Sequence, residues 1–150
     1  MRIIFLDYDG VLVPFKAPGK KARPAIADPD CVSRLNAIVR ATGAGIVVIS
    51  DWRKSTSVKK LEECHEKWGM VGKIVGTTPI RANRALEILD WAANNQDVLP
   101  PDDKFVILDD GDLQIEEQVL IDPMKGLSTK DMLEAINKLG EKHESFISRL

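Results

Sequence analysis

Short runs of apolar residues recur along this chain, separated by longer stretches in which apolar residues follow a helical spacing. Four of the five runs are nearly continuous in apolar character and do not alternate with polar residues. Strands that are buried on both faces of a parallel sheet have this pattern. The predicted strands are residues 3–6, 45–49, 73–75, 105–108 and 119–121.

The stretches between these runs predict helices, because their apolar residues recur every three to four positions. The four helical stripes start at Val32, Val58, Ala82 and Met132. Ser128 followed by Asp131 predicts a capping box that opens the last helix, over residues 128–150. Strands that alternate with helices imply right-handed crossovers, so we expect an α/β fold, a doubly wound three-layer sandwich around a mainly parallel five-stranded sheet.

One segment, residues 14–29, stands apart from this alternation. Its four prolines predict a loop or a small hairpin flap over the strand ends. The segment is too short to be a separate cap domain, and we interpret residues 1–150 as a single domain. The flap also carries a basic cluster, Lys16, Lys20, Lys21 and Arg23.

Composition and charge exclude several classes of protein. With 44% hydrophobic and 29% charged residues, the chain resembles a folded domain and not a disordered one. A net charge of -2 argues against strong non-specific binding to nucleic acid. Cys31 and Cys64 are too few for a disulfide scaffold or a structural zinc site. His65 and His143 lie in lysine-rich stretches, and we expect both on solvated helix faces.

No apolar run approaches the roughly 18 residues that a membrane-spanning helix needs. The apolar run that follows Arg2 is too short for the core of a signal peptide. We therefore expect a cytoplasmic protein that does not associate with membranes.

Acidic residues follow three of the predicted strands. Asp7 and Asp9 come after the first, Ser50 and Asp51 after the second, and Asp109 and Asp110 after the fourth. Because the carboxyl ends of parallel strands meet at one edge of the sheet, these side chains are expected to gather there. Crowded carboxylates repel one another, and a divalent cation removes that conflict. Oxygen ligands suit Mg²⁺, so the sequence predicts a magnesium site among the carboxylates at this edge.

The same segments resemble the signatures of the haloacid-dehalogenase-like (HAD) superfamily. Residues 3–12 resemble its first signature, residues 46–50 its second and residues 105–110 its fourth, and the resemblance extends from residue 2 to about residue 122. Residues 50–53 and 121–128 are similar to small capless members of the phosphatase type. Some of those members occur beside nucleic-acid repair enzymes.

This resemblance implies a role for each residue at the strand ends. Asp7 is the expected nucleophile and a metal ligand. Asp9 is the expected general acid and base, and its main-chain carbonyl also touches the metal. Ser50 is expected to bond the transferred phosphoryl group. Asp110 is expected to hold Mg²⁺ directly or through water, with Asp109 as its helper or as a second ligand.

The superfamily also uses one basic residue near the start of the helix before the fourth strand. Arg84 fits this position best, and Arg81 and Lys73 remain as alternatives. Asp51, Arg53 and Lys54 follow Ser50 and are expected, with Ser50, to contact the substrate.

The resulting prediction is a magnesium-dependent phosphohydrolase that forms a phosphate ester on an aspartate and acts on a phosphomonoester. A small ester, a phosphoprotein and the phosphorylated end of a nucleic acid all remain open as substrates. Phosphotransfer to an acceptor other than water is an alternative, as are a phosphate-accepting signalling domain and a phosphate-binding domain without turnover. In a receiver-type signalling domain the accepting aspartate follows the third strand, whereas here Gly76, Thr77 and Thr78 end that strand.

Overall fold

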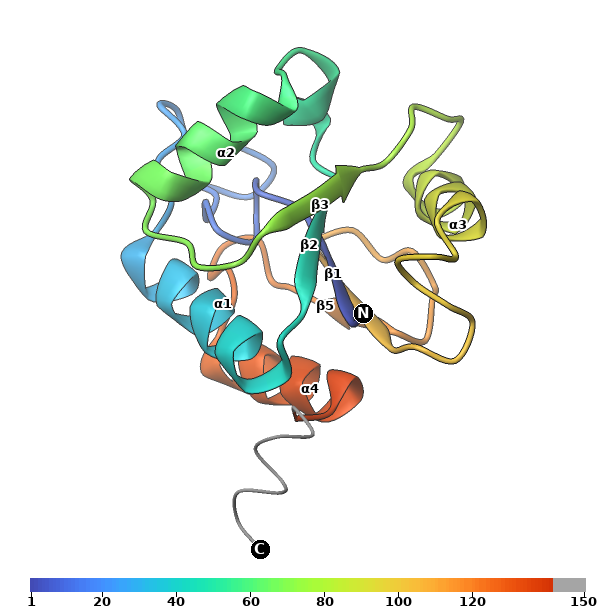
Figure 1. The fold of residues 1–150 in the computed structure, drawn as a ribbon. Helices are drawn as coiled ribbons and strands as arrows, with labels where there is room; N and C mark the ends of the chain where they lie inside the picture. The colour runs from blue at the N-terminus through green and yellow to red at the C-terminus, as the bar shows by residue number, and fades with distance from the viewer. Residues whose placement is uncertain (142–150) are drawn as a thin grey trace, which may run out of the picture.

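Five parallel strands form one sheet in the computed structural model, which describes residues 1–141 (Figure 1). The strand order is β3-β2-β1-β4-β5. This arrangement confirms the predicted α/β fold class, and each strand lies within two residues of its expected bounds. The strands are β1 (Ile3–Leu6), β2 (Gly45–Val48), β3 (Ile74–Thr77), β4 (Phe105–Asp109) and β5 (Gln118–Leu120).

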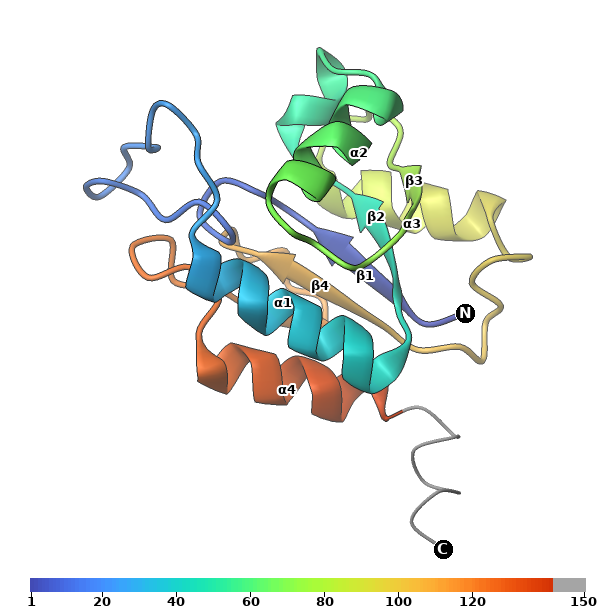
Figure 2. The same cartoon turned by 60° about the vertical axis from the view of Figure 1, so that its left-hand side comes forward.

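The two faces of the sheet are covered by different helices, as expected when side chains alternate along a strand. Ile4 and Leu6 of β1 pack on one face with α1 (Pro29–Thr42) and α4 (Thr129–Leu139), which lie side by side (Figure 2). Ile3 and Phe5 pack on the other face with α3 (Arg84–Asn94), through Trp91 among others. β1 is buried along its whole length because it has a neighbouring strand on each side and a helical layer on each face.

Side-chain caps fix where the helices begin, by satisfying N–H groups that have no partner inside the helix. Asp28 caps α1, Ser57 caps α2 (Val58–Lys67) and Asn83 caps α3. At the start of α4, Ser128 and Asp131 each accept the other's backbone N–H, which confirms the predicted capping box.

The last helix is shorter than predicted. α4 ends at Leu139, because Gly140 adopts a positive φ of 78° and donates its N–H to the Ile136 carbonyl. Residues 142–150, which include His143, lie outside the described residues. None of the described helices has the length and apolar character to cross a membrane.

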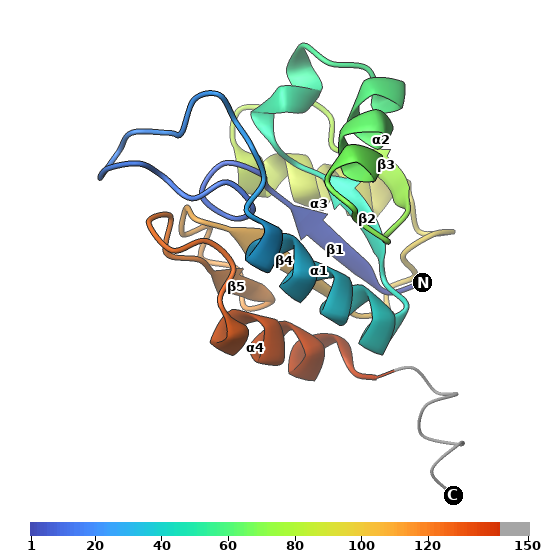
Figure 3. The same cartoon turned by 90° about the vertical axis from the view of Figure 1, so that its left-hand side faces the viewer.

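Residues 14–28, between β1 and α1, form a loop beyond the carboxyl ends of the strands (Figures 2 and 3). It contains one antiparallel bridge, between Ala17 and Lys20. The Phe15 N–H donates to the Pro123 carbonyl at 2.7 Å, and the Asp28 N–H donates to the Leu12 carbonyl at 2.7 Å. These bonds hold both ends of this loop, which we call the flap, against the sheet edge where the acidic residues lie. Within the described residues no inserted segment forms a cap domain.

Candidate active site

Three neighbouring strands bring the acidic residues together. β1 lies between β2 and β4, so Asp7 follows the central strand and Asp109 ends the strand beside it. Carboxylate oxygens of Asp7, Asp109 and Asp110 all lie within 4.8 Å of one another. The structure therefore groups three of the four residues predicted to bind the metal.

Asp7 lies at the centre of this cluster and is only 5% exposed. Its Oδ1 accepts the Tyr8 N–H at 2.8 Å, and its Oδ2 lies 3.2 Å from Nη1 of Arg84. Burial and the neighbouring Asp109 and Asp110 carboxylates raise the pKa of Asp7 to about 8, against the opposing effect of Arg84. The single guanidinium thus does not compensate the crowded acids, and the oxygen-rich cluster suits a divalent cation.

Arg84 is the predicted basic residue that reaches the cluster. It is the first residue of α3, and its Nη1 donates to Asp109 Oδ2 at 3.0 Å. Asp109 is also fixed from its other oxygen, which accepts the Gly111 N–H at 3.1 Å. Arg81 instead pairs with Asp90 at 2.7 Å, and Lys73 directly precedes β3 at the amino end of that strand. Arg84 is thus the candidate that the geometry favours.

Asp110 approaches the turn that follows β1 unusually closely. Burial and the Asp109 carboxylate raise the pKa of Asp110. A Cβ on Gly10 would lie 2.7 Å from Cγ of Asp110, and Gly10 has a φ of +83°. Only glycine fits both the positive φ and the close contact.

We expect Gly10→Ala to lower the free energy of unfolding by about 1–3 kcal/mol and to weaken Mg²⁺ binding, because the new methyl group displaces Asp110. Thermal denaturation with and without Mg²⁺ measures both effects. Gly19→Ala is the matched control, since Gly19 has a φ of +71° but nothing within 4 Å of an added Cβ. Equal loss of stability and equal Mg²⁺ response in the two variants would contradict the prediction that Asp110 binds Mg²⁺ from its position against Gly10.

Asp9 points away from the three-carboxylate cluster and toward the flap. Trp52 Nε1 donates to its Oδ2 at 3.1 Å, and Arg23 Nη1 donates to its Oδ1 at 3.2 Å. Lys21 Nζ lies 3.9 Å from Oδ2. The Asp9 carboxylate is therefore not grouped with the metal candidates, and two of the basic residues of the flap lie beside it.

Arg53 does not occupy the position expected of a substrate contact. Its side chain is 3% exposed and pairs with the buried Glu87 at 2.8 Å. Its remaining donors bond the main-chain carbonyls of Ile49, Ser50, Thr78 and Pro79. The guanidinium thus holds the ends of β2 and β3 together, and we correct its assignment from substrate contact to positioning residue.

The other residues of this turn differ in accessibility. Ser50 is 1% exposed, and its Oγ accepts the Trp52 N–H at 3.3 Å to cap a short 3-10 helix (η1, Asp51–Lys54). Asp51 and Lys54 pair with each other at 3.2 Å with side chains 57% and 44% exposed. Asp51 also lies 3.3 Å from Nη2 of Arg84, so this exposed pair borders the cluster.

The sequence interpretation did not predict the aromatic cluster next to Asp9, which consists of Tyr8, Trp52, His65 and Trp68. His65 is buried, not solvated, and its Nε2 lies 2.6 Å from the Tyr8 hydroxyl. Burial lowers the pKa of His65 to about 4, so the ring is neutral near pH 7. Trp52 and Trp68 each make an edge contact with the Tyr8 ring. The available signal was Tyr8 itself, a large aromatic residue directly after a strand that the sequence predicts to be buried.

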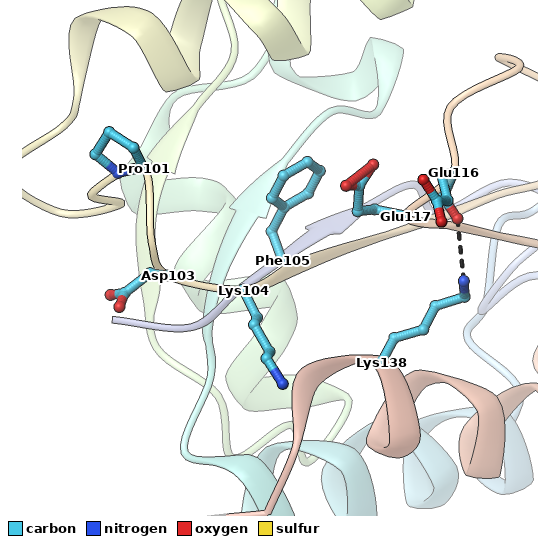
Figure 4. A pocket seen from close by; sticks show the side chains of 7 residues that line it. All are labelled: Pro101, Asp103, Lys104, Phe105, Glu116, Glu117 and Lys138. Carbon is cyan, nitrogen blue, oxygen red and sulfur yellow. Dashed lines mark hydrogen bonds between the residues drawn. The ribbon is translucent and has the colours of Figure 1, made fainter.

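A hollow of about 360 Å³ lies at the other end of the sheet (Figure 4). Phe105, the first residue of β4, lines it, and Lys138 donates to the Glu116 carbonyl there at 3.0 Å. The acidic cluster lies at the carboxyl end of the same strand. This hollow is therefore separate from the candidate active site.

Comparison with known proteins gives one family match. Residues 3–132 match the family described as the HAD domain in Swiss Army Knife RNA repair proteins. No curated protein and no solved structure matches the chain. The match covers the five strands, and it contains every residue of the candidate site described above.

Proposed function

The chain belongs to the family of HAD domains found in Swiss Army Knife RNA repair proteins, and on this premise we propose that it is a magnesium-dependent phosphomonoesterase in which Asp7 carries the phosphoryl group. One observation supports this most: the buried Asp7 lies within 4.8 Å of two other carboxylates, with Asp9 two positions later on a different side. A nucleophile, a cation site and a separate acid–base group are what this reaction needs.

The donor set fits Mg²⁺. Asp7 and Asp110 are the proposed direct ligands, as the family membership suggests. Asp109, whose oxygens accept hydrogen bonds from Arg84 and the Gly111 N–H, is proposed as a helper or as a second ligand. Asp109 then positions Arg84 and completes the negative charge of the site. When bound, Mg²⁺ supplies charge that neutralises the phosphoryl oxygens during transfer.

The reaction proposed for these residues has two steps. A carboxylate oxygen of Asp7 attacks phosphorus, the bond from phosphorus to the ester oxygen breaks, and Asp9 donates its proton to the leaving oxygen. Asp9 then takes a proton from water, which attacks the phosphorus of the aspartyl phosphate. The bond between phosphorus and the Asp7 oxygen breaks, which restores the Asp7 carboxylate and releases inorganic phosphate. Ser50 and Arg84 hold the phosphoryl oxygens, and Arg84 also orients Asp7 at 3.2 Å.

The proposed substrate is the terminal phosphate of an RNA strand. The family description names RNA repair proteins, and cationic side chains of the flap, Lys21 and Arg23, lie beside Asp9 where the leaving group departs. The exposed Lys54 borders the other side of the site. A few cations at separate places around the site suit a substrate that carries further phosphates. Such a site is compatible with a protein whose surface is not strongly basic.

A panel of phosphate esters tests the proposal. It contains an aryl phosphate, a phosphopeptide and oligonucleotides with a 3′- or a 5′-phosphate, each with Mg²⁺ and with a chelator. We expect Mg²⁺-dependent phosphate release, most efficiently from an oligonucleotide. Phosphate release from none of these esters would contradict the proposed hydrolase. Stable phosphorylation of the protein without turnover would favour the alternative of a phosphate-accepting domain.

The raised pKa of Asp7 makes the stability of the metal-free protein depend on pH. Because the folded pKa of about 8 lies above the ordinary 3.8, the folded state binds the proton more tightly. The stabilisation of the folded state by the proton on Asp7 is complete below the ordinary pKa of 3.8, and it is lost as the pH rises through about 8. We expect Mg²⁺ to raise the melting temperature little at about pH 5 and strongly at about pH 9, where no proton competes with it.

Thermal denaturation at the two pH values measures this difference. Asp7→Asn should raise the melting temperature of the metal-free protein at high pH and remove most of its response to Mg²⁺. Asp112→Asn is the matched control, since Asp112 is an exposed carboxylate outside the cluster. An equal Mg²⁺ response at both pH values would argue against Asp7 as a ligand.

A further inference from the structure

A second hollow, of about 460 Å³, lies between the end of the flap and the end of α2. The flap lies beyond the carboxyl ends of the strands (Figures 2 and 3), and Trp52 and Trp68 both contact the ring of Tyr8, which follows β1 on that side. The residues that line the hollow include Ile26 of the flap, Trp52 of η1, and Lys67 and Trp68 of α2 and its cap. Its volume is in the range of pockets that bind small organic groups.

Two indole rings form the rigid part of this hollow. The ring centroids of Trp52 and Trp68 are 5.7 Å apart, with 64° between their planes. Both rings are partly exposed, and each makes an edge contact with the fully buried Tyr8 ring, at centroid distances of 5.1 and 5.5 Å. Tyr8 is itself fixed by its 2.6 Å contact with His65, so the two indoles are held in place before any ligand arrives.

The hollow is directly connected with the proposed acid–base residue. The indole N–H of Trp52 donates to Asp9 Oδ2 at 3.1 Å, while the same side chain lines the hollow. The indole ring of Trp52 therefore lies between Asp9, where the leaving group would depart, and the hollow. In a nucleotide, one ribose separates the phosphate from the base.

The charges around the hollow suit a nucleotide. The lining includes one charged residue, Lys67, and no carboxylate. Lys21 and Arg23 of the flap lie beside Asp9, where further phosphates of a strand would pass. Flat aromatic walls with cations beside them are the features that bind single-stranded nucleic acid, because every base has an aromatic face for stacking.

We propose that this hollow binds the base of the nucleotide whose phosphate is removed, stacked against Trp68 and Trp52. The inference rests on the proposed phosphatase function and specifies its substrate: a phosphorylated strand end with an intact terminal base. The rings act through binding, so their contribution appears mainly in KM.

The test compares two oligonucleotides that differ only in whether the phosphorylated terminal nucleotide carries a base or is abasic, made for the 3′ end and for the 5′ end. For the wild-type protein with Mg²⁺, we expect kcat/KM to be roughly 10- to 100-fold higher with the base present, mainly through KM. A preference at either end supports the site. A ratio near one at both ends would overturn it, as would more efficient hydrolysis of a phosphopeptide.

Two substitutions of Trp68 separate stacking from general apolar contact. Trp68→Phe keeps an aromatic face and should keep most of the preference for the base. Trp68→Leu keeps an apolar side chain and should lower the preference by roughly 10-fold. The ratio is taken within each variant, so a general loss of folded protein cancels, and an unchanged ratio in Trp68→Leu would overturn the proposal.

Binding of the same pair to Asp7→Asn, followed by fluorescence anisotropy, separates this inference from the proposed function. If no ester is hydrolysed, the phosphatase proposal fails, while preferential binding of the strand with the intact base still supports the hollow as a base site. If both strands are hydrolysed and bound equally, the phosphatase stands and the base site is overturned.

Discussion

Asp7→Asn is expected to lower kcat/KM for the best phosphorylated substrate by at least about 1,000-fold, because an amide is a poor nucleophile toward phosphorus. Asparagine has nearly the same shape, and its oxygen can still accept the Tyr8 N–H that Asp7 Oδ1 accepts at 2.8 Å. The substitution therefore removes the attacking group and a metal ligand with little change in packing. Steady-state kinetics at saturating Mg²⁺ measures the loss.

The stability of this variant makes the result interpretable. Removing one of three crowded carboxylates relieves repulsion, so Asp7→Asn should melt no earlier than the wild-type protein without metal. Lost activity then cannot be attributed to unfolding. Asp112→Asn, outside the cluster, should retain activity within a few-fold. An Asp7→Asn protein that keeps a tenth or more of the wild-type rate would refute Asp7 as the nucleophile.

Asp9→Asn is expected to reduce turnover of an alkyl phosphate or oligonucleotide phosphate by at least about 100-fold, since the variant lacks the proton donor of the first step and the base of the second. An aryl phosphate has a better leaving group and depends less on the acid in the first step. With that substrate, the variant should release a burst of phenol comparable to the enzyme concentration and then slow, because hydrolysis of the aspartyl phosphate still needs the base.

Rapid-mixing measurements detect the burst, and Asp28→Asn provides the control. Asp28 lies, like Asp9, in the segment between β1 and α1. It caps α1 by accepting the Cys31 N–H at 3.0 Å, and asparagine is an equally good cap. That variant should behave like the wild-type protein. If Asp9→Asn turns over an oligonucleotide phosphate within a few-fold of wild type, Asp9 is not the acid–base residue.

The grouping of acids at one sheet edge could be predicted from sequence because the carboxyl ends of parallel strands lie at the same edge. The apolar run of β1 indicated a strand buried on both faces, and parallel strands place Asp7 and Asp109 at the same edge. The same local patterns predicted the fold class and the family, which the sheet topology and the family match confirm.

The burial of Arg53 could not be predicted from the sequence. In sequence Arg53 is a basic residue just after Ser50, as a substrate contact would be. Its burial depends on Glu87 of α3 and on carbonyls at the end of β3, contacts between residues distant in the chain. No local pattern distinguishes such an arginine from an exposed one.

His65 was misplaced for a related reason. Lysines and glutamates flank it along α2, so the surrounding sequence indicates a solvated face. Its burial depends on the hydroxyl of Tyr8, which lies 2.6 Å from His65 Nε2 and comes from a distant part of the chain. The sequence predicted the flap as a basic loop. It did not predict the contact of Arg23 with Asp9, which depends on how the loop folds back.

Trapping the phosphate on Asp7 tests the central claim most directly. The wild-type protein is mixed with its best substrate and Mg²⁺, quenched during turnover with borohydride, and digested for peptide mass spectrometry. Reduction of an acyl phosphate converts its aspartate to homoserine, and we predict this change at Asp7 in the peptide that contains β1. Rapid phosphate release with unmodified Asp7, or with the modification on another carboxylate, would contradict the account.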